Sequence, residues 1–538
     1  NLIWHKNKKL KCLNLTTLNK HGKVYEDDQF GCMVWSHSET HLLYVAEKKR
    51  PKTELYFQGP ETGLLGQQFE YYEDWGEELV NKSSPVLCVL DIEGSNITVL
   101  EGIPTNISPG QAFWAPNNTG LVFVGWWHEP FRLGLKYCAN RRSSLFYVDL
   151  ASGKCEQLSS NSSAVCSPRL SPDNCRIVYL ECGVFGPHQQ CSRLCMYDWY
   201  TKQTRVVVDA VQRAREDGFI GIYSSMLSPY CWSAGSQRVL MSCAQRCHKD
   251  LLVVDTSTGE VTSLTSRIDL MVVSCSSPNC PPDLRVGFLP AKGSENKMSW
   301  VTLEETQPQA DISWQTLNFS PPPPLVWTFY VILLKPKEMT AGSKLPLIVM
   351  AHGSPHSVLV SEWFLSTAVP CKMGFSVLLG EEQLQCLPYT LKSVHQTHDL
   401  AFIQTLYPCS PPPGHGRSLP RHISRCMPGV DQACKRILPS LVFVFRCMVE
   451  AGYEYNTDIH LEPAILEQML NKSPIKHVSK VKTPVLLMFG EDDKLVPSKQ
   501  GIEYYRALKA LQVPVSVSVC PQIVVVPRIG WIIQHLSL

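Results

Sequence analysis

The chain has 538 residues, of which 44% are hydrophobic and 18% charged, a composition typical of a folded protein with two or more domains. Its 50 basic and 48 acidic residues leave a net charge of +2, so no bulk field favours nucleic acid or an anionic membrane as a partner. No apolar run approaches the roughly 18 residues that a membrane-spanning helix needs. We therefore expect a globular protein whose partners are neither nucleic acid nor membrane.

The 22 cysteines are scattered, and several stand inside apolar segments, where cysteine behaves as a small hydrophobic residue. Cys191 and Cys195 have no second pair at the spacing of a zinc site, so we expect buried or free thiols and no metal.

The first residues lack an apolar leader and resemble a strand entered midway, which suggests that the true N-terminus lies upstream. Without a leader, sequons such as Asn96-Ile-Thr98 are interpreted as chance, and a reducing, cytoplasmic compartment is expected.

Residues 1–320 repeat one pattern. Four segments combine an apolar alternation, an aspartate and a turn rich in Gly, Ser or Thr, which predicts β-hairpins after Asp91, Asp149, Asp198 and Asp255. These aspartates are separated by 58, 49 and 57 residues. A period of this length with several short strands per unit is typical of a β-propeller, whose blades bury their faces against one another.

A second series interleaves with the first. A short turn and then an apolar run follow Trp35, Trp114, Leu170 and Trp232. Further copies near Asn14 and at 284–303 bring the count to five or six blades, several of them shortened. We expect an incomplete, all-β propeller over residues 1–320, with a β-sandwich of accidental similarity as the alternative.

The most distinctive segment of this region is Gly125–Arg132, which contains two adjacent tryptophans and a histidine. Propellers are commonly binding scaffolds, so the fold alone assigns no activity. Trp126 and Trp127 are expected to pack between blades rather than to bind a ligand.

The periodicity changes after the proline run 321–324, which is interpreted as a stiff linker. Continuous apolar strands then alternate with a helix, and this pattern predicts a buried parallel sheet in an α/β domain over 325–538. The expected helix is 498–511, and the expected strands are 326–334, 345–351, 374–379, 484–489 and 513–519.

Two strand ends carry the chemistry. The strand 345–351 runs into His352-Gly353-Ser354-Pro355-His356, and the strand 484–489 runs into a Gly-x-x-Asp-x-x-Val-Pro loop that contains Asp493. In this order, after a repeat domain, the two motifs resemble the prolyl oligopeptidase family of serine peptidases, and within it the acylaminoacyl-peptidases. The resemblance also covers the segments 71–76, 123–134, 472–475 and 499–509.

The resemblance implies an α/β-hydrolase fold for the second domain and a cytosolic serine exopeptidase, without a cofactor, that releases an N-acylated amino acid from a blocked peptide. A propeller narrows access to the active site of these enzymes. Residue by residue, Asp493, rather than its neighbour Asp492, matches the acid that orients the catalytic histidine. Gly353 and Ser354 match the loop that supplies an oxyanion donor, although the family has a second glycine where this chain has Ser354.

The nucleophile and the base of the family are missing. No Gly-x-Ser-x-Gly elbow occurs in the chain, and the nearest approximation is Gly416-Arg-Ser418-Leu-Pro420, where the proline disfavours the helix that should begin there. The segment 520–530 holds no histidine, and His535 matches the terminal helix instead. Residues 380–446 and 520–530 are therefore unmatched, and the α/β-hydrolase domain lacks its nucleophile elbow.

Three hypotheses follow. The chain is an aberrant or incomplete product of a gene for an active peptidase, or an inactive homologue that acts as a binding or regulatory propeller. The third is an active hydrolase that uses a substitute nucleophile, such as Ser418 or a cysteine near 426–434, which the motif losses disfavour. An incomplete propeller leaves strand edges unpaired, so self-association is also expected.

Overall fold

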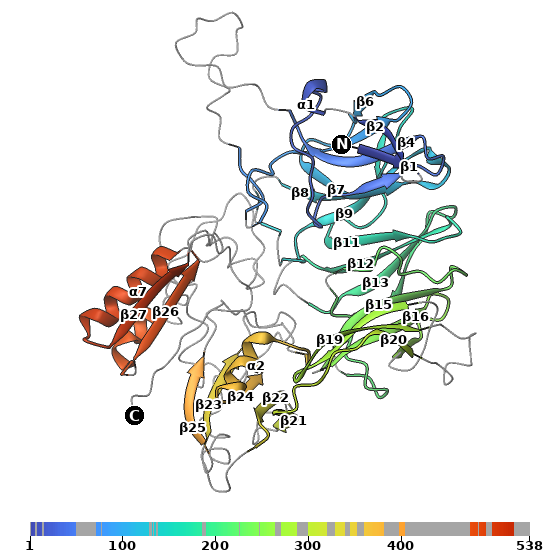
Figure 1. Cartoon of the computed structure of the whole chain (residues 1–538). Helices are drawn as coiled ribbons and strands as arrows, with labels where there is room; N and C mark the ends of the chain where they lie inside the picture. Colours follow the sequence, from blue (N-terminus) through green and yellow to red (C-terminus); the bar gives the residue numbers. More distant parts are fainter. Residues whose placement is uncertain are drawn as a thin grey trace, which may run out of the picture. The chain divides into compact units, whose positions relative to one another are not determined.

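The computed structural model describes most of the repeat region and several parts of the C-terminal region. The described residues are 2–5, 8–12, 15–49, 72–76, 78–128, 132, 134–135, 138–184, 190–212, 214–224, 226–246, 248–263, 271–287, 300–319, 329–338, 345–351, 360–380, 398–403, 474–482, 484–490 and 498–520. They belong to two compact units, which are drawn in Figure 1 and are described one at a time. The first unit comprises Asn1–Val184, Arg193–Asp209 and Ala234–Ser236, and the second comprises Phe185–Ser192, Ala210–Ser233 and Gln237–Leu538.

The first unit contains three antiparallel sheets of four strands each, in the strand orders β3-β4-β5-β6, β10-β9-β8-β7 and β11-β12-β13-β14. A two-stranded sheet, β1 (Leu2–His5) with β2 (Lys8–Cys12), and the short helix α1 (Leu15–Leu18) precede them. The twelve strands are β3 Met33–Trp35, β4 His41–Glu47, β5 Pro85–Asp91, β6 Ile97–Val99, β7 Ile107–Trp114, β8 Gly120–Trp127, β9 Ser143–Asp149, β10 Cys155–Gln157, β11 Ser163–Leu170, β12 Arg176–Gly183, β13 Arg193–Asp198 and β14 Thr204–Val208.

The four predicted aspartates each end a strand, as the sequence pattern requires. The backbone N–H of each donates to the carbonyl five residues later, and each side-chain carboxylate accepts backbone N–H groups of the turn. The fourth residue after each aspartate has a positive φ: 58° at Ser95, 68° at Gly153, 59° at Lys202 and 77° at Gly259. The predicted hairpins are confirmed, and all four use the same turn.

The second repeated turn is equally regular. The residue before each turn pairs with the residue seven positions later, as Trp35 with Leu42, Trp114 with Leu121, Leu170 with Ile177 and, in an isolated bridge, Trp232 with Val239. A residue with φ between 54° and 57° occupies the same place in each turn, namely Glu39, Asn118, Asn174 and Ser236. This shared register in four places is the repeat that the sequence predicted; closure of the sheets into a propeller stays a prediction.

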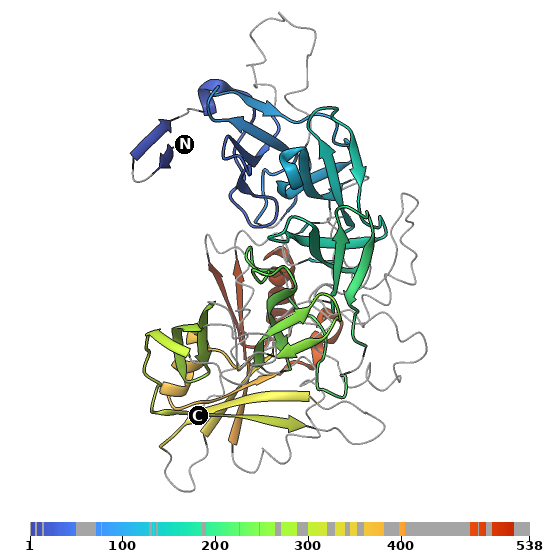
Figure 2. The ribbon, with the colours of Figure 1, turned by 90° about the vertical axis from the view of Figure 1, so that its right-hand side faces the viewer.

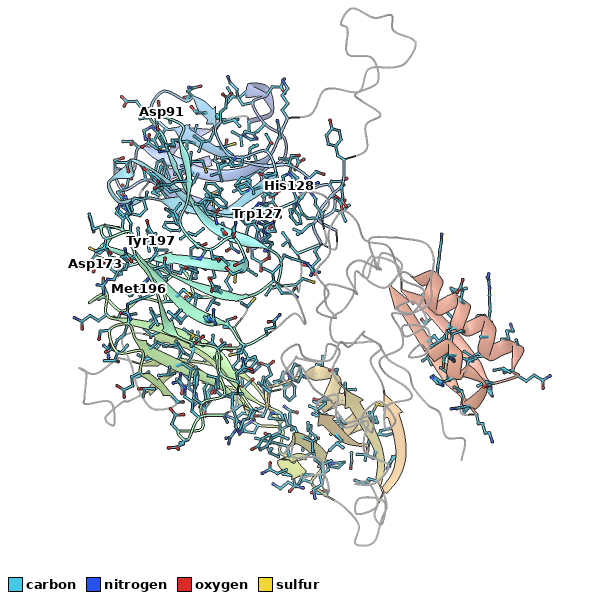
Figure 3. The ribbon with its side chains drawn as sticks, turned by 180° about the vertical axis from the view of Figure 1, so that it is seen from behind. Asp91, Trp127, His128, Asp173, Met196 and Tyr197 are labelled. Atoms are coloured by element: carbon cyan, nitrogen blue, oxygen red, sulfur yellow. The ribbon has the colours of Figure 1, made fainter. Side chains whose placement is uncertain are left out.

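The two repeated turns of the first unit lie at one end of its strands. Figure 3 shows Asp91 and Asp173, which belong to the two kinds of turn, on the side away from Trp127 and His128. The opposite end is where β4, β8 and β12 end and β5, β9 and β13 begin, so the links 48–84, 128–142 and 184–192 start and finish there. Short turns and long connections are therefore segregated to opposite ends of the sheets.

The core of the first unit lies between its sheets. Trp126 is 2% exposed and packs edge-on against Phe30, with ring centroids 5.1 Å apart, in a cluster that joins side chains of the first two sheets. Trp127 is half-buried on the same cluster, with the Arg142 guanidinium 4.4 Å from its ring. The prediction that these tryptophans pack between repeats is confirmed for Trp126, whereas the ring partner of Trp127 is Phe146 of its own sheet.

The second unit begins with two more antiparallel sheets. One consists of β15 (Arg238–Gln245), β16 (His248–Asp255) and β17 (Val261–Ser263), and the other of β18 (Met271–Ser277), β19 (Cys280–Gly287) and β20 (Trp300–Glu304). The weak repeat expected at 284–303 thus falls on β19 and β20, whereas Asn14 lies outside the described residues.

A mixed sheet follows in the order β21-β22-β24-β23-β25, seen from yellow to orange in Figure 2. Its β23 runs parallel to β24 and β25, and β22 runs antiparallel to β24. The bounds are β21 Ile312–Phe319, β22 Phe329–Pro336, β23 Leu345–Ala351, α2 Leu365–Lys372, β24 Ser376–Gly380 and β25 His398–Ile403. The sequence did not predict β25, which lies in the unmatched segment.

A separate parallel pair carries the end of the described chain. The strands β26 (Val485–Gly490) and β27 (Val515–Cys520) are joined through α7 (Ser498–Ala510), and α6 (Pro474–His477) precedes them. Helix and strands agree with the predicted elements to within two or three residues. The linker 321–324 lies outside the described residues, and the strands on either side of it, β21 and β22, pair with each other.

Candidate functional site

The predicted catalytic positions follow the carboxyl ends of two strands. Gly353 and Ser354 come two and three residues after β23 ends at Ala351, and Asp493 comes three residues after β26 ends at Gly490. All three lie outside the described residues, as do Ser418 and His535. The described part of the chain therefore contains the packed strands that precede the candidate residues, here called the supports of the site, and not the reacting groups.

The first support is the packing beneath β23. Leu347 of β23 and Val377 of β24 are fully buried, and the two strands run parallel in the register Leu347–Ser376 to Ala351–Gly380. Helix α2 covers this sheet with Ala368 and Cys371, which are both buried in the same cluster. Ligand sites of open α/β sheets gather beyond the carboxyl ends of such strands, which is where Gly353 and Ser354 follow.

The second support is the small core of β26, α7 and β27. Leu508 of α7 is fully buried and Leu487 of β26 is 2% exposed, and both pack with Val485 and Val513. The apolar spacing of α7 predicted this contact, because a helix with one apolar face must bury it against a neighbour. The strand that leads to Asp493 is thereby held from one side.

In the first unit the structure brings together two segments that carried the family resemblance, 71–76 and 123–134. Glu73 accepts the backbone N–H of Arg132 at 2.8 Å, and the Arg132 guanidinium donates to the Ser83 carbonyl at 2.7 Å. The same guanidinium lies 5.6 Å from the centre of the Trp75 ring. Sequence reasoning placed both segments but could not pair them, because 59 residues separate Glu73 from Arg132.

Burial raises the pKa of the Glu73 carboxyl above its ordinary value, and the hydrogen bonds and charge of Arg132 oppose this rise. Next to this pair, the buried Glu47 accepts the Tyr25 hydroxyl and the backbone N–H groups of Ser83 and Ser84 at 3.1 and 3.2 Å. A buried carboxylate satisfied by three donors fixes the backbone around it. We assign these contacts to holding the long connections in place.

His128 is also held within the first unit. Its Nε2 lies 2.9 Å from the Thr105 carbonyl oxygen, which can only accept, so Nε2 donates there. In the neutral ring Nδ1 then accepts the Ser108 hydroxyl, 2.8 Å away. Both ring nitrogens are thus engaged in packing contacts.

The prediction of buried or free thiols is confirmed for both named cysteines, because Cys195 is buried, Cys191 is half-buried and both are free. Cys88, Cys195 and Cys243 are 0%, 1% and 1% exposed, and burial raises the pKa of Cys88 and of Cys195 to about 12. A thiol with so high a pKa is a poor nucleophile, because the thiolate is the reactive form. Among the described residues, no group of three or more His, Cys, Asp and Glu side chains could hold a metal ion.

The sequence of the chain is similar to those of known proteins of one family. The family of the acylamino-acid-releasing enzyme N-terminal domain matches residues 2–315. The acylamino-acid-releasing enzyme of Mus musculus is 49% identical over 582 aligned positions, which include 97% of this chain and 80% of the mouse protein. The chain belongs to the family of acylamino-acid-releasing enzymes.

Other members of the family align in the same way. The acylamino-acid-releasing enzyme of Homo sapiens is 47% identical over 97% of this chain and 80% of its own length, and that of Arabidopsis thaliana is 28% identical over 93% and 78%. Among solved structures, the acylaminoacyl peptidase of Pyrococcus horikoshii superposes with a TM-score of 0.62 over 92% of this chain and 77% of its own length, at 13% identity. That likeness shows the fold.

The alignment to the mouse enzyme also shows a difference between the two proteins. It is 582 positions long, whereas this chain has 538 residues, so at least 44 aligned positions of the mouse enzyme (582 minus 538) have no counterpart here. In the described part of this member of the family, no helix is long and apolar enough to cross a membrane.

Proposed function

We propose that this acylamino-acid-releasing-enzyme homologue retains the architecture of a serine exopeptidase that releases N-acylated amino acids from blocked peptides, but is catalytically impaired. The observation that carries the proposal is the absence of any Gly-x-Ser-x-Gly segment from a chain that is 49% identical to the mouse enzyme. Without the serine no acyl-enzyme forms, and without the histidine no group accepts the serine proton.

The proposed architecture is a β-propeller over residues 1–320, the linker 321–324 and an α/β-hydrolase domain over 325–538. Four sheets with the same turns and register support the propeller, and the parallel pairs of β23 with β24 and of β26 with β27 support the second fold. One refinement follows from strand pairing, because β21 pairs with β22 and so contributes residues 312–319 to the second sheet.

Within this architecture we propose Asp493 as the surviving acid of the triad and Gly353 and Ser354 as the remnant of the oxyanion loop. Their positions directly after β26 and β23 support both roles. The nucleophile and the histidine would stand in the unmatched segments 380–446 and 520–530. The proposal that this chain has lost segments of the family sequence is supported by the 44 or more positions of the mouse enzyme that have no counterpart here. No cofactor enters this chemistry, and we propose the cytoplasm as its compartment.

The test is hydrolysis of an N-acetyl-amino-acid anilide by the purified chain, with the mouse enzyme as the positive control. We expect no release above background, because loss of two triad members leaves only the small residual catalysis of binding and oxyanion contacts. A fluorophosphonate probe, run in parallel, reports any activated serine. Labelling that Ser418→Ala abolishes would contradict the proposal and establish a substitute nucleophile.

The second candidate function is a non-catalytic binding or regulatory protein. The regular turns and the buried core of the first unit favour it, because a scaffold that binds a peptide needs the repeat domain and not the triad. Binding of an N-acetylated peptide without turnover, measured by calorimetry, would support this role. Self-association through unpaired strand edges would appear in size-exclusion runs as a mass above 60.5 kDa.

A further inference from the structure

The turn between β18 and β19 bonds to the first strand of the mixed sheet, within the second unit. At this turn Asn279 accepts the backbone N–H of Gln309 through its carbonyl at 2.7 Å. Its side-chain amide donates to the Ile312 carbonyl at 3.2 Å and accepts the Trp314 indole N–H at 3.0 Å. An indole can only donate and a backbone carbonyl can only accept, so these two partners fix the orientation of the amide.

The neighbouring residues of the repeat sheets extend the same contact to another part of the chain. Ser276, at the end of β18, accepts the backbone N–H of Trp363 at 3.1 Å, and His248, at the start of β16, lies 2.9 Å from the Ser361 hydroxyl. The Arg246 guanidinium lies 5.8 Å from the Tyr330 ring of β22. The strands β16 and β18, and the turns that hold Arg246 and Asn279, therefore contact β21, β22 and the segment 360–363.

The segment 360–363 has a particular place in the chain. It directly follows 352–359, which contains Gly353 and Ser354, and it leads into α2. Helix α2 is tied to the same region, because Lys372 donates to Gln309 at 2.5 Å. The segment 360–363 is thus held by residues of the repeat sheets as well as by its own domain.

We propose that Asn279, Ser276 and His248 form an interdomain clasp that makes the last two repeat sheets and the mixed sheet one mechanical body. The clasp holds the segment 360–363 against the repeat sheets, so a displacement of those sheets is transmitted to this segment. This function is independent of catalysis by the chain, because every contact joins described residues outside the triad positions.

Native-state hydrogen exchange of the full chain tests the clasp. Asn279→Ala removes the side-chain bonds to Ile312 and Trp314, and we expect roughly tenfold faster exchange at 309–314. The decisive readout is 360–364, to which Asn279 makes no hydrogen bond. Faster exchange there, with the 485–520 region unchanged as an internal reference, is the result that coupling predicts.

Matched variants complete the design. Ser276→Ala should speed exchange at Trp363, whereas Ser274→Ala, an exposed serine of the same strand, should leave both regions unchanged. Asn279→Asp keeps the oxygen that accepts the indole and should restore part of the protection. If Asn279→Ala accelerates 309–314 alone, or if Ser274→Ala has the same effect, the clasp is wrong; a uniform acceleration that includes 485–520 would show general destabilisation and also overturn it.

Discussion

The two ends of the sheets in the first unit are held by different kinds of contact. At the turn end many bonds are local, as in the Asp198 carboxylate that accepts N–H groups two and three residues later, although the second turns also bond to one another, as where the His37 backbone N–H donates to Asn118. At the connection end the bonds join residues far apart in the sequence, such as Lys82 with Asp27 at a separation of 55 and Arg132 with Glu73 at 59. The repeat therefore specifies the turns after the four aspartates by itself, whereas the contacts at the other end depend on the completed fold.

This difference has an energetic consequence. A local turn bond is exposed and is replaced by water when it is lost, so each one contributes little. A buried long-range network leaves several groups without partners when one member is removed, which costs more per substitution. The connection end should thus be the sensitive end, although the turns carry the visible sequence signature.

The largest effect is expected for Glu47→Ala. This change removes the acceptor of the Tyr25 hydroxyl and of two backbone N–H groups, and we expect a loss of about 2–3 kcal/mol in the free energy of unfolding. Urea unfolding monitored by circular dichroism measures it. Glu101→Ala, at an exposed glutamate, should change the stability by less than about 0.5 kcal/mol. Equal effects of the two variants would show that loss of the Glu47 network costs no more than loss of an exposed side chain, and would contradict the expected sensitivity of the connection end.

A second prediction uses pH to separate the ends. The pKa of Glu73 is raised by burial, so the native state binds this proton more tightly, and stability falls as pH rises from 4.5 through the raised value. The pKa of Asp149 is lowered by hydrogen bonds from Ser152, so its contribution is present above 3.8 and is lost as pH falls through the lowered value.

Glu73→Gln and Asp149→Asn should therefore change the pH dependence of unfolding in opposite directions. The first variant should fall less in stability than the parent chain as pH rises above 4.5, and the second should fall less as pH drops below 3.8. Urea midpoints measured between pH 3 and 7 give the slope of stability against pH for each variant and for the parent chain. If both variants change this slope in the same direction, the assignment of Glu73 as a buried carboxyl and Asp149 as a turn-bound carboxyl is wrong.

Local signals in the sequence determine which of these features could be predicted. The hairpins at the four aspartates and the helix 498–510 were predictable because alternation, turn residues and helical spacing are local signals. The contact of Glu73 with Arg132 and the clasp at Asn279 were not, since no local pattern joins residues tens of positions apart. For the catalytic site, family motifs located Asp493 and Gly353 on strand ends, and only the strands themselves are described; β25 carries no repeat or motif and was missed.

The smallest expected effect concerns the shared turn after each aspartate. Its fourth residue has a left-handed φ in all four copies, and two copies have glycine there, Gly153 and Gly259. Ser95 has φ 58° in the same place, a conformation that costs a side chain more than it costs glycine. Ser95→Gly should therefore stabilise the chain by about 0.5–1 kcal/mol.

The other copies supply the controls for this small gain. Lys202→Gly relieves the same backbone conformation but removes an ammonium that lies 4.1 Å from the Trp199 ring, a contact of about 0.5–1 kcal/mol at an exposed site, so the net change should be near zero. Gly153→Ala should destabilise by about 1 kcal/mol through the backbone alone, since an added Cβ meets nothing within 4 Å. Urea midpoints in the order Ser95→Gly, Lys202→Gly, Gly153→Ala, from highest to lowest, would establish that the turn end is governed by local conformation. A lower midpoint for Ser95→Gly than for the parent chain would show that even these turns depend on contacts beyond their own five residues.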